Sequence, residues 1–157
     1  MILTTQPGKP GQTCVALAET PRPAVPLLSR CTYGIVWTAS AQSLGHGRAF
    51  VLAVQPLESW RELWVFHESV GGWTVDVISP GAADAEEGYV EFAGFAPATQ
   101  RLLIVRELKD RGRFRRRFEE LRLEDLIPVR QASSPELLAD FGRWQDAAWR
   151  RDTLALH

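Results

Sequence analysis

The chain has 157 residues, which is enough for one domain with its own hydrophobic core. Its 18 Lys and Arg residues nearly balance its 19 Asp and Glu residues, and the formal net charge of -1 argues against a protein built mainly to hold nucleic acid or an anionic membrane. With 45% hydrophobic and 24% charged residues, the composition is that of a folded globular protein. No apolar run reaches the roughly 18 residues of a transmembrane helix.

Residues 1–12 are rich in Pro, Gly and Thr and predict a flexible N-terminal arm. They lack the basic segment followed by an apolar segment that marks a signal peptide. We therefore expect the chain either to be cytoplasmic or to start after a removed signal or at a truncated start.

Residues 13–32 predict a β-hairpin that brings the two cysteines together. Two strand-like runs flank a Pro-rich connection, and pairing Glu19 with Pro26 places Cys14 directly opposite Cys31. Directly opposed Cβ atoms are about 4.5–5.5 Å apart, so a small adjustment allows a disulfide. The alternative is two buried free thiols. If the disulfide forms, it indicates an oxidising compartment, and we then expect a periplasmic or extracellular protein.

Two segments with the same order of strand signals follow, residues 34–80 and 89–131. The first has apolar runs at 35–37, 49–54, 62–66 and 73–78, and the second has them at 89–95, 101–107 and 118–123. A repeat of about 40–50 residues built from four short strands is typical of a propeller blade.

These segments resemble the blade pattern of TolB-type propeller proteins, in which an aromatic-Ser-Pro-Asp-Gly-basic turn precedes an apolar strand and a Glu-Leu-aromatic strand. Four stretches match the pattern: Trp37–Ser40, Gly47–Val51, Glu62–Phe66 and Phe95–Leu103. Both turns lack the Asp-Gly, and residues 41–46 are an insertion. The resemblance implies blade-like sheets over about 35–130. The whole chain is also similar to the C-terminal portions of uncharacterised exported proteins of proteobacteria, which implies no particular activity.

The segment 111–126 is open between helix and strand. Phe114, Phe118 and Leu121 have helical spacing, whereas a strand needs a bulge near Glu119. The repeat pattern favours the strand. The tail, 134–151, predicts a helix packed on the β-domain.

Ser134 would cap that helix and Pro135 would be its first residue. The expected fold is therefore a mainly β domain over 13–132, with two to three antiparallel propeller-like blade sheets, or a sandwich of them, and a C-terminal helix. Closed propellers have at least about four blades, so the chain is too short to complete one. It caps its sheets with the helix, packs them as a sandwich, assembles with another copy or is a fragment of a longer protein.

The histidines provide no familiar catalytic or metal-binding pattern. His46 stands between two glycines of a turn, and His67 ends a strand beside Glu68 with no Gly-x-Ser-x-Gly to supply a nucleophile. No two histidines have metal-ligand spacing, and the sequence has neither Gly-x-Gly-x-x-Gly nor a Walker loop. We expect no metal and no cofactor. Whether the protein is an enzyme stays open, and the patterns favour one that is not.

Aromatic and basic residues are the remaining candidates for a binding surface. Trp60 and Trp73 flank turns, and Trp149 lies on the predicted helix, so each can contact a ligand or partner. Trp37 and Trp64 are expected to fill the core. A basic cluster is formed by Arg113, Arg115, Arg116 and Arg117, with Arg111 close by.

The function that these patterns favour is a non-enzymatic protein-interaction or envelope-associated scaffold module, with a protein partner or self-association. One alternative is an enzyme or a carbohydrate- or small-ligand-binding domain with its site in the loops 38–47 and 55–61. Another is nucleic-acid binding through Arg111–Arg117, which requires those five Arg to form one exposed stripe. A flat apolar patch or an unpaired sheet edge favours the first reading, and a pocket near Trp60 and His46 favours the ligand site.

Overall fold

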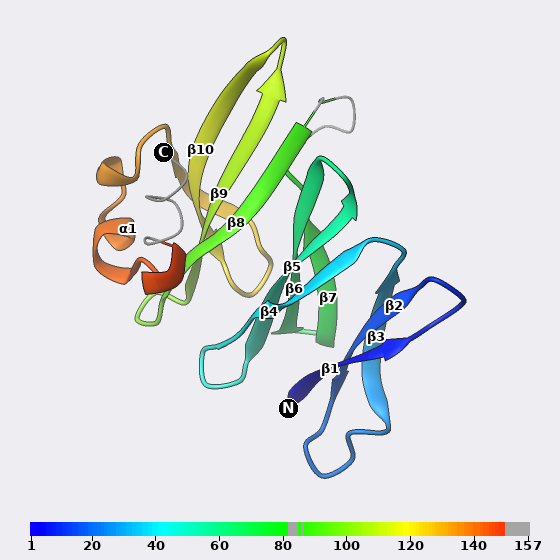
Figure 1. Cartoon of the computed structure of the whole chain (residues 1–157). Coiled ribbons are helices and arrows are strands. Elements are labelled where there is room, and N and C mark those ends of the chain that lie inside the picture. The colour runs from blue at the N-terminus through cyan, green and yellow to red at the C-terminus, as the bar shows by residue number, and fades with distance from the viewer. Residues whose placement is uncertain (82–84, 86, 150–157) are drawn as a thin grey trace. The chain divides into compact units, whose positions relative to one another are not determined.

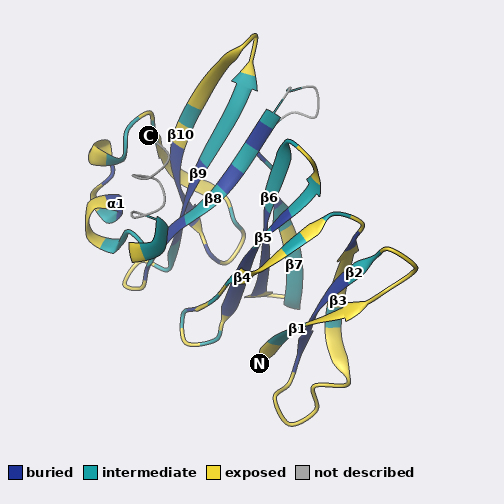
Figure 2. Ribbon diagram, viewed as in Figure 1, coloured by how far each residue is buried: buried dark blue, intermediate teal, exposed yellow. Residues whose placement is uncertain are grey.

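The computed structural model describes residues 1–81, 85 and 87–149, and these residues form mostly β-strands (Figure 1). They contain eleven strands and a few short helical segments near the C-terminal end, and they belong to two compact units, residues 1–78 and 79–157. The predicted mainly β fold class is confirmed. Burial is concentrated in the central strands of each unit, whereas the turns are exposed (Figure 2). The number of propeller blades stays a prediction.

The first unit begins with a three-stranded antiparallel sheet made of β1 (Ile2–Pro7), β2 (Thr13–Ala18) and β3 (Pro26–Thr32). Cys14 lies opposite Cys31 as predicted, and the two cysteines form a disulfide. The predicted pair of Glu19 with Pro26 is wrong by one residue, because a register shift after Leu17 places Pro26 opposite Ala18. Disulfides persist in oxidising compartments, and this pair therefore indicates one.

The N-terminal arm expected over 1–12 is ordered along half its length. β1 pairs with β2 from Ile2 opposite Ala18 to Pro7 opposite Thr13. Of the Pro and Gly residues that predicted a loose arm, Pro7 ends β1 and the others lie in the β1–β2 turn, where the Gly8 N–H donates to the Gln12 carbonyl. Leu3 packs against the core, so this short segment gains enough apolar contact to join the sheet.

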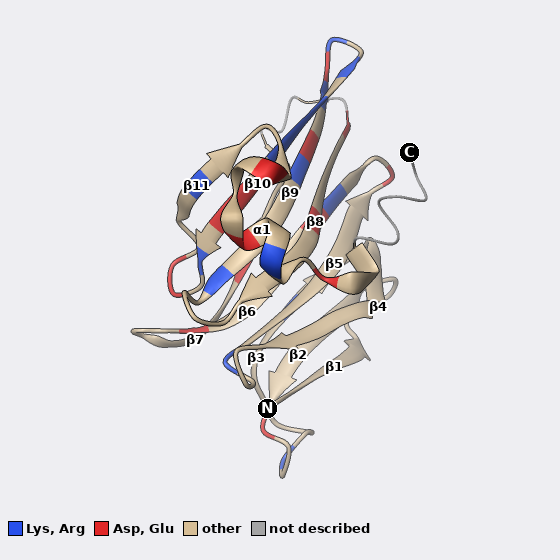
Figure 3. Cartoon of the chain, turned by 90° about the vertical axis from the view of Figure 1, so that its left-hand side faces the viewer, with Lys and Arg blue, Asp and Glu red and all other residues tan. Residues whose placement is uncertain are grey.

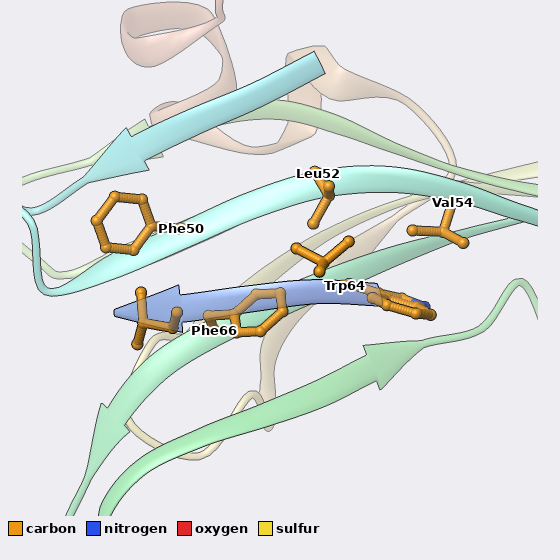
Figure 4. Packing of buried hydrophobic residues seen from close by; sticks show 7 residues of the cluster. Phe50, Leu52, Val54, Trp64 and Phe66 are labelled. Atoms are coloured by element: carbon orange, nitrogen blue, oxygen red, sulfur yellow. The ribbon is translucent and has the colours of Figure 1, made fainter. Parts of the chain in front are cut away.

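A four-stranded antiparallel meander completes the first unit. Its strands are β4 (Ile35–Leu44), β5 (Ala49–Leu57), β6 (Trp60–Ser69) and β7 (Gly72–Ile78). Alternate side chains of β5 and β6 face β2 and form a core (Figure 4) that contains Val15, Leu17, Phe50, Leu52, Val54, Trp64 and Phe66. Burying each such large side chain contributes about 1.5–3 kcal/mol. The first unit is therefore a sandwich of two sheets.

The second unit contains another four-stranded antiparallel meander, with strands β8 (Glu87–Ala96), β9 (Arg101–Asp110), β10 (Arg113–Arg122) and β11 (Pro128–Ala132). The ambiguous segment 111–126 is therefore mainly strand. The bulge expected near Glu119 is absent from β10, which pairs with β9 without interruption from Arg113 to Arg122. The register shift against β11 between Glu120 and Leu121 places the extra residue, Val129, on β11.

The predicted helix 134–151 is shorter and broken. A 3₁₀ turn covers Pro135–Leu137, and α1 covers Ala139–Trp144. Leu138 interrupts them in an extended conformation, and its buried side chain joins the core of this unit. Ser134 makes no side-chain capping bond, because its hydroxyl donates to Glu136. Residues 150 and 151 lie outside the described residues.

Candidate functional site

A cluster of exposed apolar side chains lies where β3 passes into β4. Tyr33, Ile35 and Trp37 are 67%, 53% and 46% exposed, although all three are large. We call these three residues the β4 patch. The chain carries no Lys, Arg, Asp or Glu from Thr32 to Gly47, so the patch lies in an uncharged stretch. Interface centres combine aromatic residues with few charges, which is the composition of this patch.

Two local features hold the β4 patch in place. A Cβ on Gly34 would lie 2.1 Å from the Gln55 carbonyl oxygen, so only glycine lets the chain pass this close to β5. After Trp37 the pairing of β4 with β5 is interrupted until Gln42. The Ser40 hydroxyl fills this gap, since it donates to the Trp37 carbonyl (2.6 Å) and accepts from the Ala53 N–H (2.8 Å).

Sequence reasoning placed Trp37 in the core, and the structure corrects this. Trp64 is buried at 2% exposure, whereas Trp37 is 46% exposed. The run Ile35–Val36–Trp37 reads as continuously apolar, but only Val36 packs against the core of the first unit. The alternation of side chains along a strand was the signal that could have separated the two tryptophans. Tyr33 and Ile35 were missed for the same reason.

The proposed ligand site between the loops 38–47 and 55–61 is not assembled as one site. His46 is exposed in the β4–β5 turn with a φ of 57°, and Trp60 is half-buried at the start of β6, opposite Leu57. These turns lie at opposite ends of β5, which spans nine residues. At about 3.3 Å per residue they are separated by more than 20 Å.

His67 is a buried side chain with one ionic partner. It is 2% exposed, and its Nε2 lies 2.7 Å from Oδ2 of Asp76 on β7. A carboxylate can orient a catalytic imidazole, but the other ring nitrogen must then reach a reacting group. Nδ1 of His67 has no hydrogen-bond partner among the described residues. This pair therefore links β6 to β7 and brings no nucleophile with it.

The other two tryptophan candidates belong to cores. Trp73 packs against the core of the first unit, with its ring 6.2 Å from that of Phe50. Trp149 packs against the core of the second unit, and its indole N–H donates to Glu91 at 2.9 Å.

The basic cluster lies on the β9–β10 hairpin (Figure 3). Arg113, Arg115 and Arg117 alternate along one face of β10, whereas Arg116 lies on the other face and pairs with Glu107 at 3.1 Å. Arg111 is in the turn. The five Arg therefore do not form the single stripe that nucleic-acid binding through all of them requires.

Two buried carboxylates beside this cluster were not foreseen. Glu119 and Glu120 are both 0% exposed and, as neighbours on β10, face opposite sides of the sheet. Glu120 accepts from Arg101 at 2.9 Å, and Glu119 accepts from Arg106 and Arg117. Each carboxylate keeps one oxygen without a partner among the described residues. Their burial is unusual, since Glu is almost never fully buried unless it is paired, and the sequence alone does not show which arginines pair with them.

An exposed ion pair closes the β10–β11 turn. The Arg122 guanidinium donates to both carboxylate oxygens of Asp125, and one of these oxygens also accepts from the Ile127 N–H. The hydrogen bond from Arg122 lowers the pKa of Asp125 below its ordinary value, and the same bond raises the pKa of Arg122.

Comparison of the chain with protein-family models, curated proteins and solved structures finds no match. Within the described residues, no His, Cys, Asp and Glu side chains gather in a group that could hold a metal ion. In the same part of the chain, no helix has the length and apolar character needed to cross a membrane.

Proposed function

We propose that the chain is a non-enzymatic protein-interaction module, associated with the cell envelope in the periplasm or outside the cell. The observation that carries this proposal is the β4 patch. Three large apolar side chains within five residues are each about half exposed or more, in a stretch without charge. A partner that covers these side chains removes their apolar surface from water, and this burial favours binding.

The disulfide supports the location. Cys14 and Cys31 form it within the β2–β3 pair, and structural disulfides are rare in a reducing cytosol. The alternative, a ligand site that combines His46 and Trp60, has no such support, because these two residues lie near opposite ends of β5. The two four-stranded meanders also support the TolB-type resemblance, and we keep the blade-like repeat as part of the proposal.

A photo-reactive amino acid placed at Trp37, in cells that express the protein, tests this function. The matched control is the same amino acid at Val70, which is 92% exposed in the β6–β7 turn of the same unit. We expect a defined protein adduct from position 37 and none from position 70. Equal adducts at both positions, or no protein adduct at position 37, would overturn the proposal.

A further inference from the structure

The β9–β10 hairpin carries a concentration of positive charge that the balanced composition conceals. Between Glu107 and Arg117 the chain has six basic residues and two acidic ones. Of the six, Lys109, Arg116 and Arg117 pair with carboxylates of Glu87, Glu107 and Glu119. Among the described residues, no ion pair engages Arg111, Arg113 or Arg115. Three guanidinium groups are therefore available to an anion from outside.

The two acidic residues nearest the hairpin on β10 do not offset its positive charge. Glu119 and Glu120 contribute two of the chain's acidic residues, but both are 0% exposed and matched by arginines. Arg101 and Arg106 neutralise these two carboxylates inside the unit. What remains at the hairpin is a local positive surplus, since electrostatic attraction acts over about a Debye length rather than over the whole molecule.

The hairpin tip extends beyond its neighbouring strand. β8 pairs with β9 only as far as Glu87 opposite Lys109, whereas β9 and β10 continue to Asp110 opposite Arg113. Arg111 and Gly112 close the tip with φ angles of 51° and 74°, which is the pattern of a tight two-residue turn. From Asp110 to Arg113 the tip is thus a narrow projection (Figure 1), and Phe114 and Arg115 follow it at the level of the end of β8.

An exposed aromatic ring lies on the same hairpin as these charges. Phe114 is 51% exposed and follows Arg113 on β10, so its ring lies on the opposite face of the hairpin from Arg113 and Arg115, where the Lys109 ammonium is 5.6 Å from the ring centre. Basic side chains around an exposed apolar ring are the combination that adsorbs to anionic membrane surfaces, where the charges meet headgroups and the ring enters the interface.

We propose that the tip of the β9–β10 hairpin, with Arg111, Arg113, Arg115 and Phe114, adsorbs to the anionic headgroups of a lipid membrane surface. Nucleic acid offers similar phosphates, but the disulfide indicates an oxidising compartment such as the periplasm or the cell surface, which a membrane borders, rather than the cytosol or nucleus, where nucleic acid is held. Adsorption of this kind is independent of the β4 patch, so it stands whether or not the proposed protein partner exists.

Co-sedimentation with vesicles tests the inference. The probes are vesicles of phosphatidylglycerol mixed with phosphatidylcholine, and vesicles of phosphatidylcholine alone. We expect binding of the full chain only to the first, and weaker binding as salt rises. Replacing the three arginines with glutamine (R111Q, R113Q, R115Q) should lower the partition coefficient about 100-fold, since each basic residue near such a surface contributes about fivefold.

A second triple variant removes the same charge elsewhere. Arg22, Arg48 and Arg130 are exposed, and R22Q, R48Q, R130Q should bind nearly as well as the wild type. F114S should weaken binding without altering its salt dependence, whereas V70S should have no effect. An equal loss in both triple variants would show a net-charge effect and overturn the site. So would absence of binding at low salt, tighter binding to single- or double-stranded DNA than to the vesicles, or displacement by inorganic phosphate.

Discussion

The two meanders have the same topology, β4–β7 and β8–β11, but are stabilised differently. In the first, the middle strands bury apolar residues against a sheet that the disulfide joins. In the second, a short helical tail covers one face, and the strand β10 buries two carboxylates. The same arrangement of strands therefore tolerates an apolar interior or an ionic one, provided that neighbouring strands supply partners.

The first strands of the two meanders, β4 and β8, are each interrupted in their pairing, and different groups complete the hydrogen bonds there. β8 has a register shift between Phe92 and Gly94, and the tail completes it: Gly94 bridges to Gln145, and the Asp146 N–H donates to the Ala93 carbonyl at 2.7 Å. β4 closes its own interruption through Ser40. Tyr33, Ile35 and Trp37, where β3 passes into β4, are exposed. We therefore place the proposed partner at the start of β4.

The largest effect is expected from breaking a buried ion pair of the second meander. R101A leaves Glu120 as a buried charge without its cation and should lower the free energy of unfolding by about 3–5 kcal/mol. The double variant R101L, E120L imitates the apolar interior of the first meander and should regain most of this loss, because burial of the ion pair itself contributes little. Urea unfolding of the wild type, R101L, E120L and the double variant measures the cycle, and R101A is unfolded beside them. A double variant as unstable as R101A would show that the two interiors are not interchangeable.

The second prediction concerns the disulfide. Replacing both cysteines with serine (C14S, C31S) should lower the free energy of unfolding by about 3 kcal/mol, the value for a loop of this length. Hydrogen exchange should rise in β1 to β3 and stay unchanged in β9 and β10, since the bond lies within the first unit. A reductant should reproduce the effect in the wild type. Faster exchange spread evenly over both meanders would contradict the assignment of the bond to the first unit alone.

The sequence alone predicts those features of the two units that a local pattern determines. The Cys14–Cys31 register follows from hairpin arithmetic, and the strand at Arg113–Arg122 follows from the repeat. Burial did not follow in the same way. Whether Trp37 faces the core depends on which face of β4 the three-stranded sheet covers, and this is a long-range contact.

The carboxylates illustrate the same limit. Glu119 is buried because Arg106 and Arg117 reach it from positions 13 and 2 residues away. The sequence alone shows adjacent opposite charges, and these are as compatible with a solvated surface as with a buried pair. The broken tail is similar: Leu138 is extended between the two helical segments, and its buried side chain joins the hydrophobic cluster that contains Ala93, Leu103 and Phe118.

A smaller effect is expected where β4 closes its own interruption. S40A removes the hydroxyl that joins the Trp37 carbonyl to the Ala53 N–H, and should lower the free energy of unfolding by about 1 kcal/mol, the usual contribution of a hydrogen bond. Water can replace the lost group here, because Ser40 is only half-buried. Hydrogen exchange at the Ala53 amide measures the change, with S43A on the same strand as the control. Unchanged protection at Ala53 would contradict the role given to Ser40.

The smallest effect on stability, and the most informative for function, is expected at the β4 patch. The double variant Y33S, I35T removes exposed apolar surface and keeps a β-branched residue in the strand, so the free energy of unfolding should change by no more than about 0.5 kcal/mol. The protein adduct from a photo-reactive group at position 37 should nevertheless disappear, because a partner loses the apolar contacts beside that group. A folded variant that still forms the adduct would show that the partner is held elsewhere. A variant that loses several kcal/mol would show that these side chains stabilise the unit itself, and the contrast between a covered β8 and an uncovered β4 would then no longer indicate a docking surface.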